Sequence, residues 1–333
     1  MKHTIDLQKY NLRTDLAIEK VAYISSKKVK KRKYKDIIIE TIDITKDDSK
    51  IIKRKEGKYT TISFNDATDT DSMKNLEDVL TEELKKYLNV KKDDLILVIG
   101  LGNVLSTPDS LGPKVIDYIT ITNHLYEMNL CDSKYQKVAG LIPSVTGKTG
   151  IETFDQIKSI VDKIKPKIII AIDSLAASSI SRVNKTIQIT NTGINPGSGI
   201  GNLRKEISFD TIGVPVIAIG VPTVVDATSI VFDTLNYMLK KYMFSKKNIN
   251  NKKFLLTYNN INYLNEDVII KEEDRELLLG LVGKLNDHEL KELIYEVLTP
   301  IGYNLMVTTK EIDFMIDNFV KIISDSLNAF FSS

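Results

Sequence analysis

Three continuous runs of apolar residues limit most strongly how this chain can fold. They lie at residues 94–100, 167–173 and 214–221. A strand that is apolar at every position is buried on both faces, which is typical of a parallel sheet covered by helices. Segments with helical apolar spacing follow the runs, at residues 112–128, 152–164 and 227–240. This alternation predicts an α/β fold, a mainly parallel sheet flanked by helices.

Two further segments predict a small antiparallel β element near the N-terminus. Residues 36–44 and 58–64 are rich in β-branched side chains and are separated by a charged turn, as in paired strands. The basic block at residues 27–35 precedes them. Because like charges resist packing, we expect that block to be an exposed loop, and a basic patch for an acidic partner is the alternative.

Amphipathic helices are expected before the first apolar run and at the C-terminus. Apolar side chains recur at helical spacing in residues 73–88 and again in residues 312–330, which buries one stripe of each helix. The second stripe predicts a terminal helix that packs on the α/β body or on another subunit. The pairs Asn286–Glu289 and Thr308–Glu311 have the spacing of capping boxes, which mark helix starts.

The composition excludes several classes of protein. Of the 333 residues, 42% are hydrophobic and 27% are charged, as in folded globular proteins. The 46 Lys and Arg residues nearly balance the 44 Asp and Glu residues, so we expect no direct nucleic-acid binding. We expect neither a membrane-spanning segment nor a signal peptide. The single cysteine, Cys131, excludes an internal disulfide and suits a reducing, cytoplasmic compartment.

Two aspartates stand where the chemistry of such a fold is usually found. Ligands and catalytic groups gather at the carboxyl ends of parallel strands, where loops lead into helix N-termini. Asp109 lies in the loop that follows the first apolar run, and Asp173 closes the second run. We therefore expect both carboxyl groups to face one cleft.

A pair of buried carboxyl groups can hydrolyse an amide. Ionising both groups together is costly, so one keeps its proton while the other is ionised. The ionised carboxylate activates water, and the protonated one donates to the carbonyl oxygen and then to the leaving nitrogen. The alternative is structural: Asp109 caps the following helix, and Asp173 binds backbone amides.

Other motifs give little support to a cofactor or a metal. Leu105 in GLGNVL stands where the dinucleotide fingerprint needs a small residue, and the three histidines are too widely spread for a metal cage, so neither is expected. The stretch GSGIGN at residues 197–202 offers backbone amides to an oxyanion or forms a plain turn. Possible supporting residues for the aspartates are Gly102, Asn103, Gly199 and Asn202.

Several long strings resemble the spore germination protease family. They are RTDLAIE at residues 13–19, GLGN and TPDSLGP within 100–113, TGIET at 149–153, AIDSLA at 171–176, TGINPGSGIGN at 192–202 and IGVPTVVDA at 219–227. The resemblance continues to NLMVT at residues 304–308. A more distant likeness to hydrogenase maturation proteases, in the GxGN strand and the later aspartate, implies the same α/β architecture.

The resemblance implies an endopeptidase that degrades small acid-soluble spore proteins during germination, in the cytoplasm of the spore core. It also implies a homotetramer that is made as a zymogen. The family cuts after an acidic residue and before a hydrophobic one, and its propeptide ends at such a site. The matching bond here is Asp15–Leu16, so the resemblance implies that residues 1–15 leave on activation.

The catalytic aspartates of the family match Asp109 and Asp173, the pair reached above from the strand ends. The chain departs from the family pattern at Ser110, Ser174 and Asn195, where Ala, Ala and His are more common. The change at Asn195 puts in doubt any imidazole required in that loop.

The domain organisation follows from these assignments. We expect a propeptide at residues 1–15, and an α/β catalytic domain with a β insertion at residues 16–245. Residues 246–333 would form a surface insertion and helices packed on the same body. Two other functions stay open at this point: a metal-dependent peptidase on the same fold, and a non-catalytic scaffold that binds spore proteins.

Overall fold

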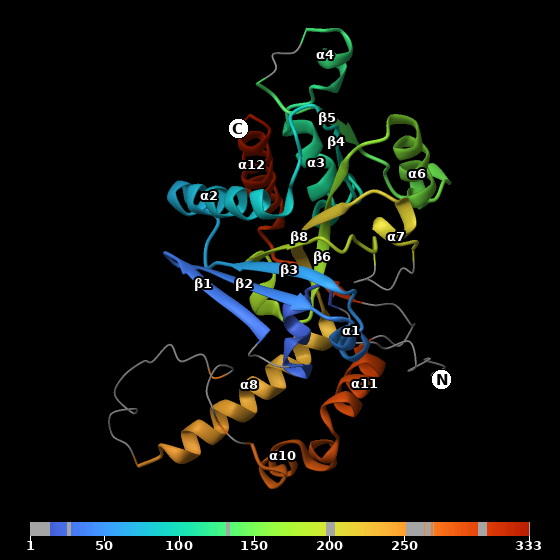
Figure 1. The fold of residues 1–333 in the computed structure, drawn as a ribbon. Coiled ribbons are helices and arrows are strands. Elements are labelled where there is room, and N and C mark those ends of the chain that lie inside the picture. The colour runs from blue at the N-terminus through green and yellow to red at the C-terminus, as the bar shows by residue number, and fades with distance from the viewer. Residues whose placement is uncertain are drawn as a thin grey trace. The chain divides into compact units, whose positions relative to one another are not determined.

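The computed structural model describes residues 14–24, 28–130, 134–197, 204–250, 263, 268, 270–298 and 305–332 (Figure 1). The chain divides into two compact units. Of the described residues, the larger unit holds those up to 177, residues 181–224 and those from 308 onward. The smaller unit holds residues 178–180 and the described part of 225–307.

One sheet joins all the strands of the described residues. Nine strands run in the order β1-β2-β3-β7-β8-β6-β4-β5, with β9 paired to β8. Their bounds are β1 (Val29–Tyr34), β2 (Ile37–Ile44), β3 (Gly57–Ser63), β4 (Ile96–Gly100), β5 (Val138–Leu141), β6 (Ile168–Ala177), β7 (Thr186–Thr190), β8 (Val216–Asp226) and β9 (Met306–Val307).

The sheet has a parallel core and an antiparallel part. Strand β4 pairs parallel with both β5 and β6, which confirms the parallel arrangement predicted for the first two apolar runs. The third run lies in β8, which pairs antiparallel with β7 and β9. Strands β1, β2, β3, β7 and β8 follow one another in antiparallel pairs. The predicted antiparallel pair is present as β2 and β3, and it continues the central sheet through β7.

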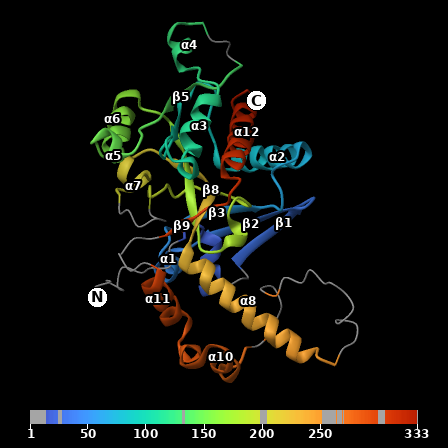
Figure 2. The same cartoon turned by 180° about the vertical axis from the view of Figure 1, so that it is seen from behind.

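Helices cover both faces of the sheet in the larger unit (Figures 1 and 2). Their bounds are η2 (Ala17–Tyr23), α1 (Lys46–Ile52), α2 (Thr70–Tyr87), η4 (Thr107–Asp109), α3 (Leu111–Tyr118), α4 (Asn123–Glu127), α5 (Thr146–Thr149), α6 (Thr153–Ile164), α7 (Phe209–Ile212) and α12 (Ile312–Phe331).

The side chains of β4 alternate between two parts of the hydrophobic core. Ile96 and Val98 belong to the cluster formed with α2, α3 and α12. Leu97 and Ile99 belong to the cluster formed with α6 and α7. The strand is therefore buried on both faces, which is the physical reason for its unbroken apolar run. The predicted docking of the C-terminal helix on the α/β body is confirmed.

The basic block at residues 27–35 is not a loop, and that prediction was wrong. Residues 29–34 form β1, the edge strand, in antiparallel register with β2. The backbone makes the ladder, so a strand at the edge needs no apolar side chains, and lysines there discourage pairing with another chain. Arg32 also reaches across to Glu83 on α2, with 2.6 Å between Nη2 and Oε1.

A single helix over residues 112–128 was also a wrong prediction. Helix α3 ends at Tyr118, and α4 starts at Asn123. Thr122 lies between them, where its hydroxyl donates to the carbonyl oxygen of Gln136 at 2.6 Å and accepts from the amide of Val138 at 2.9 Å. These side-chain bonds tie the segment to β5 and compete with helix formation.

Of the two predicted capping boxes, one forms. The amide of Glu289 donates to Asn286 Oδ1 at 3.0 Å, and the amide of Asn286 donates to Glu289 Oε2 at 2.9 Å. Thr308 caps no helix, because its hydroxyl donates to the carbonyl oxygen of Thr223 at 2.7 Å and α12 begins only at Ile312. That prediction was wrong.

Apart from the end of β8 and β9, the regular elements in the described part of the smaller unit are helices. It contains α8 (Ala227–Lys247), α10 (Glu272–Leu279), η8 (Gly280–Lys284) and α11 (Asp287–Leu298). Phe232 of α8 packs with Leu290 and Ile294 of α11. Among the described helices of the chain, none has the length and apolar character needed to cross a bilayer.

Candidate active site

Asp173 lies in β6, where its carboxyl group is almost completely buried. The residue is 5% exposed, and its Oδ1 accepts from the amide of Ser174 at 2.9 Å. Burial raises the pKa of Asp173 well above its usual value, and the negative charges of Asp109 and Asp15 raise it further. Asp173 therefore holds its proton more readily than an exposed aspartate does.

Asp109 ends the short helix η4, in the loop between β4 and α3. Its amide donates to the carbonyl oxygen of Ser106 at 2.8 Å, and the hydroxyl of Thr223 donates to the carbonyl oxygen of Pro108 at 2.7 Å. Burial raises the pKa of Asp109 to about 6, against the lowering effects of the Asn103 amide and Arg204. Asp109 is thus largely ionised at neutral pH.

The two aspartates share one end of the sheet. Their strands, β4 and β6, are parallel neighbours, and Gly100 pairs with Ile172 next to Asp173. The charge of Asp109 acts on Asp173, and the guanidinium of Arg204 acts on both. The N-cap position of α3 is Ser110, which makes no side-chain cap. This end of the sheet therefore brings together two carboxyl groups whose pKa values are both raised by burial.

Two of the possible supporting residues, Gly102 and Asn103, shape the loop of Asp109. The amide of Asn103 donates to the carbonyl oxygen of Asp109 at 2.9 Å. Gly102 has φ +116°, and a Cβ there would lie 2.1 Å from the same oxygen and 3.2 Å from Oδ1 of Asp109. Only glycine allows this approach. Gly199, Asn202 and Cys131 lie outside the described residues.

Replacing Gly102 by Ala is expected to reduce proteolysis about 10- to 100-fold while the chain stays folded. The new methyl group meets the carbonyl oxygen of Asp109 and must displace it, and a displaced catalytic group costs about that much. Peptide cleavage rates and circular dichroism of the two chains provide the measurement. Gly147→Ala is the matched control, because a Cβ at Gly147 meets nothing within 4 Å.

Replacing Asp109 by Asn is expected to stabilise the fold above pH 6. The folded pKa of Asp109 is about 6 against a usual value of 3.8. Its contribution to stability is therefore complete below pH 3.8, declines as the pH rises, and is lost above about 6. Asn does not titrate, so the variant gains on the order of 3 kcal/mol at pH 7.5.

Urea unfolding of both chains at pH 7.5 and at pH 3.5 tests this expectation. The difference in the free energy of unfolding should vanish at the lower pH. An equal difference at both pH values would show that ionisation of Asp109 is not its cause.

The residues Thr14–Ala17, here termed the cleavage segment because the sequence predicts a cut within them, lie against the strand that carries Asp173. The amide of Asp15 donates to the carbonyl oxygen of Ala176 at 2.9 Å. The amide of Ala176 donates back to Oδ2 of Asp15 at 2.9 Å. Leu16 and Ala17 are both 0% exposed. The Asp15–Leu16 bond is thus buried against β6, the strand that carries Asp173.

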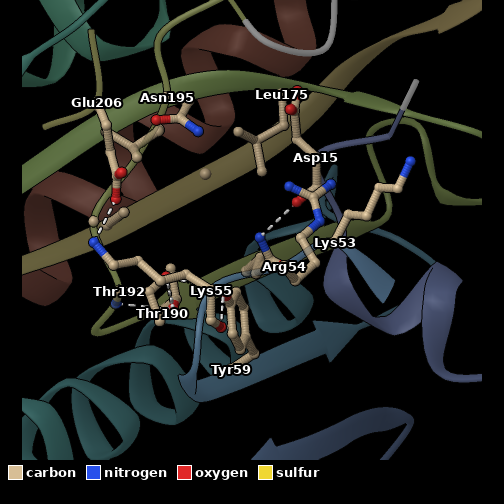
Figure 3. A pocket seen from close by; sticks show the side chains of 15 residues that line it. Asp15, Lys53, Arg54, Lys55, Tyr59, Leu175, Thr190, Thr192, Asn195 and Glu206 are labelled. Atoms are coloured by element: carbon tan, nitrogen blue, oxygen red, sulfur yellow. Dashed lines mark hydrogen bonds and ion pairs between the residues drawn. The ribbon is translucent and has the colours of Figure 1, made fainter. Parts of the chain in front are cut away.

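A pocket opens beside the cleavage segment. Figure 3 shows Asp15 near Arg54 at one end of it, and Lys55 with Glu206 at the other. Lys55 Nζ lies 2.7 Å from Glu206 Oε1, so its charge is balanced within the pocket. Arg54 donates from Nη2 to the carbonyl oxygen of Thr14, and it therefore holds the backbone of the segment.

No cluster for a metal is found in the described residues: no group of three or more His, Cys, Asp or Glu side chains is placed to hold one there. The titratable groups that converge at the site are the carboxyl groups of Asp15, Asp109 and Asp173. The chemistry that these groups can perform directly is proton transfer to and from water and an amide.

Comparison with known proteins agrees with the geometry. A family model described as germination protease matches residues 6–333. The chain belongs to the germination protease family. The resemblance seen in the sequence motifs is thereby confirmed, and the chain is a protease of spore germination.

Named germination proteases match nearly the whole chain. That of Priestia megaterium is 42% identical over 99% of this chain and 96% of its own length. That of Bacillus subtilis is 41% identical over 98% of this chain and 95% of its own length. That of Bacillus cereus strain 03BB102 is 42% identical, also over 99% of this chain and 96% of its own length.

Sequence reasoning missed two residues that bind the cleavage segment of this germination protease. They are Arg54, in the loop after α1, and Gln188, within β7. Arg54 carries no local signal, because a charged residue after a short helix is ordinary. Gln188 does carry one: it is the amide side chain in the strand sequence TIQIT, which is buried throughout.

Proposed function

We propose that this germination protease is an endopeptidase in which Asp109 and Asp173 share the work of hydrolysis. Asp109, ionised at neutral pH, removes a proton from water as the water oxygen attacks the peptide carbonyl carbon. Asp173, which keeps its proton, donates a hydrogen bond to the carbonyl oxygen during the attack and then transfers that proton to the leaving nitrogen. The observation that carries the proposal is that the parallel neighbours β4 and β6 bring both carboxyl groups to one end of the sheet, where burial raises the pKa of each.

The same site explains a preference for an acidic residue before the cut and an apolar residue after it. The carboxylate of Asp15 accepts the amide of Ala176 at 2.9 Å, a bond that a neutral aliphatic side chain could not make. Leu16 is completely buried, which favours an apolar side chain by about 2 kcal/mol. The proposed substrates are the small acid-soluble spore proteins, wherever an acidic residue precedes an apolar one.

We further propose that the full chain is a zymogen that cuts itself between Asp15 and Leu16. The cleavage segment occupies the place that a substrate peptide would need, so residues before the cut block the site until they leave. Self-cleavage removes residues 1–15 and makes Leu16 the new N-terminus. The proposed mature form is a homotetramer of the spore core.

The test is to incubate the purified full chain and to follow its mass over time, across a range of pH values. The expected product lacks residues 1–15, and it cuts a peptide containing Thr-Glu-Phe-Ala between Glu and Phe. Activity should persist in a metal chelator, since a metal-dependent peptidase would lose it. A chain that cuts neither itself nor the peptide would exclude the proposed function.

A further inference from the structure

The side-chain amide of Gln188 bridges the bond at which the chain is proposed to be cut. Its Nε2 donates to the carbonyl oxygen of Asp15 at 3.1 Å. Its Oε1 accepts the amide of Ala17 at 2.7 Å. The carbonyl of Asp15 is the one that the Asp15–Leu16 cut would attack. One side chain thus binds the backbone on both sides of that bond.

The sheet fixes Gln188 in place. Its backbone lies in β7, paired antiparallel with Thr61 of β3 and with Gly220 of β8. The neighbours Ile187 and Ile189 are 0% exposed, and Gln188 itself is 6% exposed. A group held this firmly needs little reorganisation during a reaction, which is what an electrostatic contribution to catalysis requires.

The partners of this amide point to a role beyond packing. Within the described residues, both side-chain hydrogen bonds of Gln188 go to the cleavage segment. A buried amide without partners costs about 1–3 kcal/mol. When residues 1–15 leave, the carbonyl of Asp15 leaves with them, and the donor of Gln188 loses its acceptor. An extended peptide with a carbonyl in the same place would restore that bond.

Other backbone contacts show that an extended chain fits here. Arg54 donates to the carbonyl oxygen of Thr14, one residue before Asp15. Ala176 accepts the amide of Asp15 at 2.9 Å. Each of these hydrogen bonds is made to a main-chain group of the segment. Any substrate peptide that lies in the same register can therefore make the same bonds.

We propose that Gln188 is a catalytic residue of this germination protease, a donor that polarises the carbonyl of the bond to be cut. As the water oxygen bonds to that carbon, the C=O π electrons move onto oxygen, and the N–H of Gln188 stabilises the charge that develops. Asp109 takes the proton of the water. When the C–N bond breaks, the nitrogen leaves with the proton of Asp173. The inference rests on the proposed function.

The test compares self-cleavage of the full chain in two Gln188 variants. Gln188→Met removes both hydrogen bonds with little change of shape. Gln188→Glu keeps an oxygen to accept the amide of Ala17, but it cannot donate when ionised. Losing one oxyanion donor lowers a rate by about 100- to 1000-fold, so both variants should fall by that factor. Rates are read by mass spectrometry and corrected for the folded fraction from circular dichroism.

Gln136→Met is the matched control. Gln136 is also buried, 5% exposed, and its amide donates to carbonyl oxygens of the loop before β4, including that of Asp94 at 2.6 Å. This variant loses buried hydrogen bonds away from the cleavage segment. It should lose stability and keep the wild-type rate per folded molecule.

Two results would overturn the inference and leave the proposed function standing. One is a wild-type rate in Gln188→Met while Asp173→Asn is inactive. The other is a wild-type rate in Gln188→Glu alone, which would show that holding Ala17 matters and donation does not. If the wild-type chain itself cuts nothing, both proposals are wrong.

Discussion

The full chain with Asp173→Asn is expected to stay uncut between Asp15 and Leu16 and to cleave no peptide. Asn has nearly the same shape as Asp but has no acidic proton to give. General acid catalysis is worth about 100- to 10,000-fold in rate, and self-cleavage should fall by at least the lower figure. Intact mass over time, with the peptide assay in parallel, provides the measurement.

A second buried aspartate offers a matched control for this prediction. Asp226 is 5% exposed, as is Asp173, and its Oδ1 caps α8 by accepting the amide of Thr228 at 2.7 Å. Asn is an equally good cap, so Asp226→Asn should cut at the wild-type rate. Near-normal cleavage by Asp173→Asn would remove that residue from the catalytic role, and the same holds for Asp109→Asn.

The sequence could predict that Asp109 and Asp173 lie at one end of the sheet, because each aspartate stands close to the end of an apolar run in the sequence. An unbroken apolar run reports a strand buried on both faces, and its last residues mark the end of the sheet where loops converge. Asp173 ends such a run, and Asp109 follows one within a short loop. The parallel pairing of β4 and β6 then brings the two together.

The contacts of the cleavage segment could not be predicted in this way. Asp15 meets Ala176 and Ala17 meets Gln188, partners separated by 161 and 171 positions. No periodicity within either stretch reports such a pair, since it depends on how the whole sheet is ordered. The edge strand β1 could not be predicted for a related reason. Its hydrogen bonds are made by the backbone, and its charged side chains are typical of an exposed surface rather than of a strand.

The pKa separation within the pair also needed the structure. Sequence position shows that two carboxyl groups follow strand ends, but it does not show how much water reaches each. The buried setting of Asp173 raises its pKa well above the usual value, whereas that of Asp109 rises only to about 6. The proposed roles of acid and base rest on that difference.

The full chain with Asp15→Ala is expected to keep its first residues, or to be cut elsewhere. The methyl side chain cannot accept the amide of Ala176, which donates to Oδ2 of Asp15 at 2.9 Å. A buried amide left without an acceptor costs about 1–3 kcal/mol, and the segment loses its register against β6. Self-cleavage at Leu16 should therefore slow by about 10- to 100-fold.

Asp15→Glu keeps the carboxylate and lengthens the side chain by one methylene group. It therefore tests whether an acidic group at this position is enough for the cut. A cavity of about 110 Å³ lies beside Asp15, several times the roughly 30 Å³ that one water molecule occupies. It has room for the extra methylene of Glu, so this variant should still be trimmed to Leu16. Rapid trimming of Asp15→Ala at the same bond would contradict the prediction, because it would show that the acidic side chain does not position the cut. Rapid trimming of Asp15→Glu together with an intact Asp15→Ala would place the preference for an acidic residue in the hydrogen bond to Ala176.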